Sequence, residues 1–216
     1  MKIYALAITL VYALISSTAN ALIIDDFTDG SMAVTANNLG LFINSNSSFG
    51  GGRNVSIRKM GLGNARADVI TTLGLYAHSA DASTSATSTI SWSDTSGIDL
   101  VENLENNIFA FDIHTIDQGE ITFNLSVTDL FNNTKSVSLS GIDAGIHNIS
   151  FTSFSGLNFH QVTEISLQAI GGTASDFIIN SLSTTGQISA VPVPPAFILF
   201  GSSIMILGLK RLKNTA

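Results

Sequence analysis

Alternating apolar and polar residues dominate the middle of this 216-residue chain. In the clearest run, residues 121–128, the apolar side chains alternate with Thr, Asn and Ser. Because successive side chains of a strand point to opposite faces, such a run predicts a strand with one buried face. The same alternation recurs at 55–57, 90–92, 109–113, 136–140, 149–151 and 165–169.

Turn-forming residues separate these runs. Examples are Asp117-Gln118-Gly119, Asn132-Asn133 and Gly171-Gly172, which are typical of loops between strands. Strands at a spacing of about 8–14 residues predict an all-β fold, an antiparallel β-sandwich over residues 22–183. A jelly roll of about eight to ten strands fits this length.

Two segments of this region lack the strand pattern. Residues 79–88 consist of Ser, Ala, Thr and one Asp, and this low complexity predicts an exposed loop. Residues 98–106 carry the only helical pattern within the domain. Residues 184–190 are polar, and we expect them to be a short linker after the last strand.

The N-terminus has the three parts of a secretory signal peptide. Lys2 precedes an apolar run from Ile3 to Ile15, and small residues follow, with Ala19 and Ala21 at positions −3 and −1 of a cleavage site. Residues 1–21 are therefore predicted to be removed during export. The alternative is a buried N-terminal helix.

The C-terminal segment, residues 191–216, also has three parts. All three prolines of the protein lie in Val191-Pro192-Val193-Pro194-Pro195-Ala196. An apolar segment predicts a transmembrane helix over residues 196–209, which is short for a bilayer core of about 30 Å. Lys210, Arg211 and Lys213 within 210–213 form a basic stop, which places the domain on the opposite side of the membrane from the cytoplasm.

This tail resembles the PEP-CTERM sorting signal that exosortases recognise. The resemblance rests on Val191-Pro192-Val193-Pro194, on the glycine-containing helix with Gly201 and Gly208, and on the basic end. Val193 occupies the position where the commonest form of the motif has Glu, so this is a Val-Pro-x-Pro variant. A plain single-span anchor is the alternative for the same segment.

The two ends together predict an exported protein. We expect a membrane-anchored precursor with a periplasmic domain, and then a cell-surface or extracellular-matrix location. The expected partners are the inner membrane, signal peptidase and, as the resemblance implies, an exosortase-like processing enzyme. The function expected first is a non-enzymatic surface or matrix protein. The alternatives are a carbohydrate-binding module for exopolysaccharide and a polysaccharide hydrolase.

Charge and composition exclude several other functions. Residues 22–190 contain five basic and sixteen acidic residues, a net charge of −11. Such a domain repels nucleic acid, so no nucleic-acid partner is expected. The chain contains no cysteine, which excludes disulfides, cysteine-ligated metals and thiol catalysis.

The first and last predicted strands resemble the terminal strands of jelly-roll carbohydrate-binding modules. That resemblance implies a structural Ca²⁺ held by Asp25 or Asp26 together with Asp176, through carboxylate and carbonyl oxygens. The alternative is that these three are solvated acids at strand ends. No other cofactor is expected.

Other candidate sites have simpler interpretations. Gly50-Gly51-Gly52-Arg53 precedes a strand rather than a helix, which indicates a turn and not a phosphate loop. Arg53 and Arg58 are expected on opposite faces of that strand, so they do not form one basic patch. The four histidines lack metal-ligand spacing and are expected at the surface or at strand edges. Adjacent Asp25 and Asp26 point to opposite faces of a strand and cannot form a glycosidase pair. Trp92 and Tyr76 are candidates for stacking on a sugar, although the alternation with Ile90 also fits a core position for Trp92.

Overall fold

The computed structural model describes residues 21–36, 42–46, 52–102, 106–117 and 120–186. The chain divides into two compact units, Met1–Gly186 and Gln187–Ala216, and all described residues belong to the first. The predicted signal peptide, except for Ala21, and the whole predicted sorting tail lie outside the described residues. Among the described residues, no helix has the length and apolar character needed to cross a membrane.

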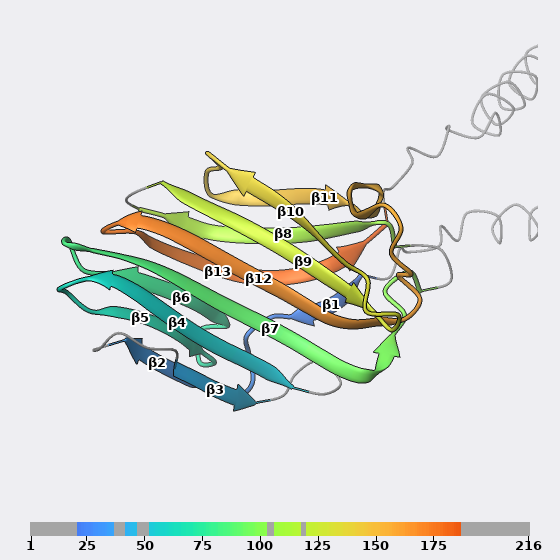
Figure 1. Ribbon diagram of the computed structural model, residues 1–216, viewed down its shortest axis with the longest axis horizontal. Coiled ribbons are helices and arrows are strands. Elements are labelled where there is room, and N and C mark those ends of the chain that lie inside the picture. Colours follow the sequence, from blue (N-terminus) through green and yellow to red (C-terminus); the bar gives the residue numbers. More distant parts are fainter. Residues whose placement is uncertain (1–20, 37–41, 47–51, 103–105, 118–119, 187–216) are drawn as a thin grey trace, which may run out of the picture. The chain divides into compact units, whose positions relative to one another are not determined.

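The domain is a sandwich of two antiparallel sheets (Figure 1). Sheet A has the order β11-β8-β13-β6-β5-β2, with β1 also paired to β13, and sheet B has the order β10-β9-β12-β7-β4-β3. The strands are β1 (Leu22–Asp25), β2 (Met32–Ala36), β3 (Phe42–Asn46), β4 (Arg53–Gly61), β5 (Ala65–Ile70), β6 (Leu75–Ala80), β7 (Thr84–Ile98), β8 (Ile108–Ile116), β9 (Ile121–Asp129), β10 (Thr134–Ser140), β11 (Gly145–Ser150), β12 (Val162–Thr173) and β13 (Asp176–Thr185), with a 3₁₀ turn η1 at Phe151–Phe154.

Eight of these strands form nested antiparallel pairs. β9 pairs with β10, β8 with β11, β7 with β12, and β6 with β13. The successive pairs alternate between sheet B and sheet A. Four nested pairs rolled onto two sheets are the topology of a jelly roll, so the predicted fold class is confirmed. The described residues form thirteen strands, more than the eight to ten predicted, because β1 to β5 extend the two sheets.

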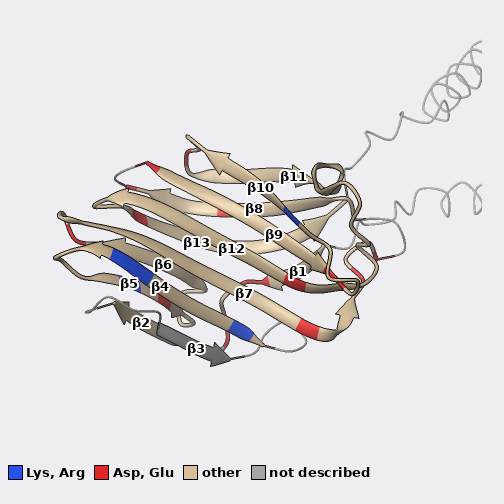
Figure 2. Cartoon of the chain, viewed as in Figure 1, with Lys and Arg blue, Asp and Glu red and all other residues tan. Residues whose placement is uncertain are grey.

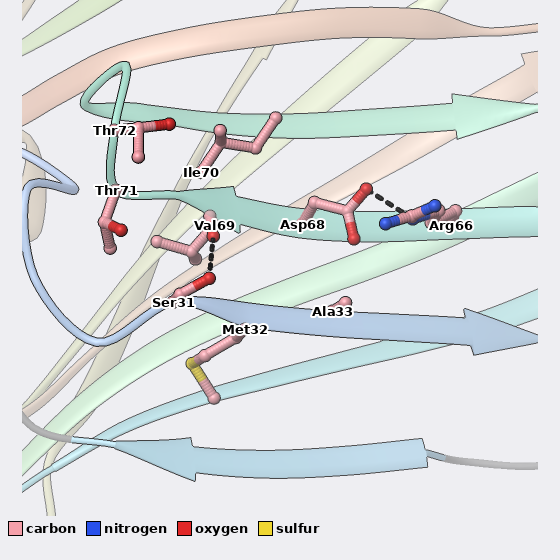
Figure 3. A pocket seen from close by; sticks show the side chains of 9 residues that line it. All are labelled: Ser31, Met32, Ala33, Arg66, Asp68, Val69, Ile70, Thr71 and Thr72. Carbon is pink, nitrogen blue, oxygen red and sulfur yellow. Dashed lines mark hydrogen bonds and ion pairs between the residues drawn. The ribbon is translucent and has the colours of Figure 1, made fainter.

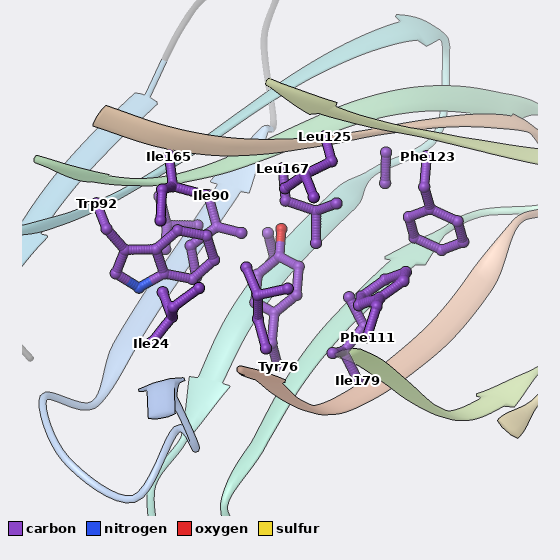
Figure 4. Close-up of a cluster of buried hydrophobic side chains, with 14 of the residues drawn as sticks. Ile24, Tyr76, Ile90, Trp92, Phe111, Phe123, Leu125, Ile165, Leu167 and Ile179 are labelled. Carbon is purple, nitrogen blue, oxygen red and sulfur yellow. The ribbon is translucent and has the colours of Figure 1, made fainter. Parts of the chain in front are cut away.

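The alternation along the strands places the apolar side chains between the sheets. In β9, Ile121, Phe123, Leu125 and Val127 are buried, as predicted from their spacing. They pack with inward-facing side chains from both sheets, including Trp92 and Phe111 (Figure 4). Burial of this apolar surface is the main favourable term for folding.

Three local predictions need correction. Residues 84–88, expected in a loop, belong to β7, where Thr84, Ala86 and Ser88 are buried between the sheets because they are small enough to fit there. Ile98 ends β7, and Asp99 to Glu102 are not helical because Glu102 has a positive φ of 41°. Thr184 and Thr185, expected in the linker, extend β13 by pairing with Phe109 and Ile108 of β8.

Candidate functional site

Asp25, a predicted calcium ligand, lies in the interior of the sandwich. Its residue is 2% exposed, and its carboxylate accepts hydrogen bonds from the Phe27 amide (2.8 Å) and from the Trp92 indole Nε1 (2.6 Å). The Arg53 Nε lies 3.1 Å from the same carboxylate, and both side chains are fully buried. These contacts give Asp25 a structural role that joins β1 of sheet A to β4 and β7 of sheet B.

Asp26 and Asp176 do not join Asp25. Asp26 is exposed and accepts hydrogen bonds from the Thr28 hydroxyl (2.7 Å), which lowers the pKa of Asp26, and from the Thr28 amide (3.1 Å). Asp176 accepts a hydrogen bond from the Ala80 amide (3.2 Å) at the first residue of β13. Asp25, in contrast, pairs with Leu182 near the last residues of the same strand. Six residues of extended strand separate these ends by roughly 20 Å.

The predicted calcium site, Asp25 or Asp26 together with Asp176, is therefore not assembled. Moreover, the part of the chain that the structure describes contains no group of three or more His, Asp or Glu side chains arranged to hold a metal ion. The expectation that Asp25 and Asp26 point to opposite faces agrees with their burial.

Arg53 also contacts the segment that follows β1. Its Nη2 donates to the backbone carbonyl of Asp29 (2.8 Å) and to the carboxylate of Asp29 (2.9 Å), and the guanidinium lies 5.8 Å from the centre of the Phe27 ring. Arg58, in contrast, is exposed, so the two arginines face opposite sides of β4 as predicted. The sequence places Arg53 on an inward position but gives no sign of its acidic partners.

His78 contradicts the expectation that all four histidines lie at the surface or at strand edges, because β6 lies between β13 and β5. It is 2% exposed, its Nδ1 lies 2.8 Å from the Ser88 hydroxyl, and its ring stacks on Phe177 at 4.8 Å. Burial lowers the pKa of His78 to about 4, so the ring is neutral near pH 7. His160 is exposed and pairs with Asp99 at 3.1 Å.

The two candidate sugar-stacking aromatics are also interior residues. Trp92 is fully buried and Tyr76 is 1% exposed. Burial raises the pKa of Tyr76. Neither ring reaches the surface, so neither can stack on a ligand, and both belong to the core that Figure 4 shows.

The outer face of sheet B carries a regular array of uncharged polar side chains. The strand registers align outward-facing residues of β4, β7, β12, β9 and β10 in rows across the sheet. We call three adjacent rows the sheet B face. They are Asn54-Ser91-Ser166-Ser126-Ser136, Ser56-Thr89-Gln168-Asn124-Ser138 and Arg58-Thr87-Ile170-Thr122-Ser140.

Hydrogen bonds link neighbouring side chains within these rows. Asn124 is the centre, since its Nδ2 donates to Gln168 Oε1 (3.3 Å) and its Oδ1 accepts from the Ser138 hydroxyl (2.6 Å). Ser126 and Ser136 share a hydroxyl hydrogen bond of 2.7 Å. An amide side chain has two N–H donors and an oxygen with two lone pairs, so these bonds use only part of its capacity.

The sheet B face has almost no charge. Of its fifteen residues, all described, only Arg58 is charged. Glu164, Asp94 and Asp129 lie nearer the ends of their strands, and Figure 2 shows the central parts of β7, β12 and β9 without charged residues. The face can therefore offer many neutral donors and acceptors to a ligand along extended strands.

The sequence indicates part of this face. The Ser, Thr and Asn residues that alternate with apolar ones in 121–128 and 136–140 already predict a polar outer surface for β9 and β10. In β7 the position of Thr87 was missed because residues 84–88 were expected in a loop, whereas Ser91 lies within the strand predicted at 90–92. Alternation of outward Ser85 and Thr87 with small inward residues was the signal available there.

No family model and no curated protein matches the chain. Among solved structures, the family 11 carbohydrate-binding module of the cellulosomal cellulase Lic26A-Cel5E of Clostridium thermocellum shares 13% identity, with a TM-score of 0.39 over 79% of this chain and 96% of that chain. TmCBM61, solved with β-1,4-galactotriose, shares 13% identity at a TM-score of 0.38, over 62% of this chain and 88% of that chain.

A third similar structure belongs to an enzyme. The agarase AgWH50C shares 10% identity, with a TM-score of 0.44 over 76% of this chain and 26% of that chain. Likeness at this level does not identify a ligand or an activity for the present chain.

Proposed function

We propose that this protein is an exported, non-enzymatic surface or matrix protein whose sandwich domain binds a neutral polysaccharide along the sheet B face. The observation that carries the proposal is the set of three rows in which thirteen of fifteen side chains are hydroxyls or amides, with Arg58 as the single charge and Ile170 as the single apolar residue. A neutral glycan presents hydroxyl groups that both donate and accept hydrogen bonds. Binding it to this face removes almost no charge from water, which keeps the desolvation cost low.

The same geometry predicts weak binding. A net hydrogen bond in water contributes about 1 kcal/mol, and the sheet B face offers no aromatic side chain for stacking. A few such bonds correspond to a Kd on the order of 1 mM for a short oligosaccharide. Many copies of the protein on one surface, or many repeats along one polysaccharide, would raise the effective affinity.

Binding is tested with the full chain in a zwitterionic detergent, because a detergent with a sugar headgroup would compete. Retardation in gels containing neutral glucans, galactans or mannans is expected for at least one of them. The double variant Asn124→Ala, Gln168→Ala should bind at least about 10-fold more weakly, as expected for the loss of two or more hydrogen bonds. No new reducing ends should accumulate during incubation with the bound glycan.

The matched control is Asn180→Ala, which removes an amide from sheet A, where Asn180 donates to Asp112. This variant should bind like the original protein. Equal binding by the double variant, or no binding to any glycan of the panel, would refute the proposal.

The export part of the proposal rests on the sequence signals at residues 1–21 and 191–216. Its test compares cells that express the full chain with cells that express a chain ending at Ala190. The full chain should be found in the membrane fraction and then in the surface or matrix fraction. The shortened chain should be found in neither of these fractions. A cytosolic protein with both ends intact would contradict the proposed localisation.

A further inference from the structure

Sheet A carries a pocket on its outer face, on the side of the sandwich away from the sheet B face. The pocket has a volume of about 170 Å³ and lies over β2 and β5, beside the turn at Thr71 and Thr72 (Figure 3). Outward-facing Ala33 of β2 and Arg66, Asp68 and Ile70 of β5 line it. It uses no residue of the sheet B face.

One wall of the pocket is an ion pair. Arg66 Nε lies 2.5 Å from Asp68 Oδ2, and the two side chains are 57% and 15% exposed. This contact raises the pKa of Arg66, which stays charged. The other carboxylate oxygen, Asp68 Oδ1, is shielded from water and has no hydrogen-bond partner. A donor from the pocket therefore reaches this carboxylate at Oδ2, which accepts from Arg66 and keeps a second lone pair for another hydrogen bond.

The rest of the pocket combines apolar surface with hydroxyl groups. Ala33 and Ile70 supply small apolar contacts, and Thr71 and Thr72 supply hydroxyls. The Ser31 hydroxyl donates to the Val69 carbonyl at 3.3 Å, which leaves its oxygen available as an acceptor. The site thus offers a carboxylate, a guanidinium, neutral hydroxyls and an apolar patch within one small volume.

We propose that this pocket is a second binding site, for the ring of a single sugar residue. Two adjacent ring hydroxyls match the wall, one donating to the Asp68 carboxylate and the next accepting from the Arg66 guanidinium. The C–H side of the ring lies against Ala33 and Ile70. The pocket takes one residue, such as a chain end, whereas the sheet B face extends along several strands.

The test follows the backbone amides of the isotope-labelled full chain by NMR during titration with glucose, galactose or mannose. At least one sugar, at concentrations on the order of tens of millimolar, should shift amides within residues 31–33 and 66–72. Cyclohexanol has a six-membered ring with one hydroxyl and should not produce these shifts. Asp68→Asn and Arg66→Met should each weaken the sugar effect at least 10-fold while the melting temperature stays close to that of the original protein.

The matched control is Lys135→Met, which removes an exposed cation from β10, outside the three rows of the sheet B face, and should leave the sugar titration unchanged. The proposal is overturned if no sugar shifts these amides, if cyclohexanol shifts them equally, or if both pocket variants titrate normally. The NMR titration tests the pocket separately from the gel retardation that tests the sheet B face. The double variant Asn124→Ala, Gln168→Ala removes contacts of the sheet B face and leaves the pocket intact. Failure of one site is therefore distinguishable from failure of the other.

Discussion

Two members of the buried Asp25-Arg53-Trp92 cluster, Arg53 and Trp92, lie on strands that carry the sheet B face on their opposite side. In β4, Arg53 points inward and Asn54 outward, and in β7, Trp92 points inward and Ser91 outward. The inward cluster contains full charges held by specific short contacts. The outward rows contain neutral groups whose hydrogen-bonding capacity is only partly used.

This difference indicates what each set of polar residues can tolerate. A buried charge is stable only with its partners, so removing Asp25 would leave the buried Arg53 charge with only the exposed carboxylate of Asp29. A half-exposed hydroxyl that loses its neighbour bonds to water instead. The interior cluster should therefore determine whether the domain folds, whereas the outer rows should determine what it binds.

The largest expected effect comes from removing the acid of the buried cluster. Asp25→Ala leaves the Arg53 charge without its buried partner and deprives the Trp92 indole and the Phe27 amide of their acceptor. We expect the free energy of unfolding to fall by about 3–5 kcal/mol. Urea unfolding followed by fluorescence measures this directly, since Trp92 is the only tryptophan of the chain.

The neighbouring acid provides the control. Asp26→Ala removes an exposed carboxylate that bonds only locally to Thr28 in the described contacts, and it should cost less than about 1 kcal/mol. Similar losses for the two variants would show that the interior cluster has no special importance.

The second effect concerns pH and the buried His78. Its pKa is about 4 when folded and about 6.5 when unfolded, so the unfolded chain takes up a proton first as the pH falls. Stability is therefore complete above about pH 6.5 and decreases between pH 6.5 and 4, by about 3 kcal/mol in total. Melting temperatures measured across this range, for the original protein and His78→Gln, should show the decrease only in the original.

The exposed acids act in a different range. The Thr28 and Ser96 hydroxyls lower the pKa values of Asp26 and Asp94, and the resulting stability is lost only as the pH falls below about 3.8. Parallel decreases of both proteins between pH 6.5 and 4 would exclude His78 as the cause.

The smallest effect is expected on the outer face. Ser126→Ala breaks the hydroxyl hydrogen bond with Ser136, but water can replace the lost partner. The free energy of unfolding should change by no more than about 0.5 kcal/mol in urea titrations. A loss as large as that of Asp25→Ala would mean that these rows stabilise the fold and are not reserved for a ligand.

Alternation along single strands was predictable from the sequence, and contacts between strands were not. The pattern of 121–128 and the opposite facing of Arg53 and Arg58 are local properties, and the structure confirms both. The partners of Arg53 depend on how β1, β4 and β7 meet across the sandwich. The residue pattern within a single strand does not indicate which strands pack against each other across the sandwich.

The calcium prediction shows the same limit. Asp25 and Asp176 both lie on paired terminal strands, but β1 pairs with the last residues of β13 and Asp176 is the first residue of that strand. His78 and the start of β7 were misplaced because small neutral residues such as Ala80, Thr84 and Ser88 give no apolar signal, although they are buried between the sheets.

The pairing of the first strand with the last has a mechanical consequence. Leu22 lies opposite Thr184 in an antiparallel pair, so the start of β1 and the last residues of β13 lie at the same end of sheet A. Tension between these two points would open the β1–β13 ladder bond by bond, as a zipper opens, instead of shearing all of its bonds together. Because β1 carries Asp25, release of β1 would also separate the Asp25 carboxylate from Arg53 and Trp92. Tension on the two ends of the domain would therefore destabilise its core.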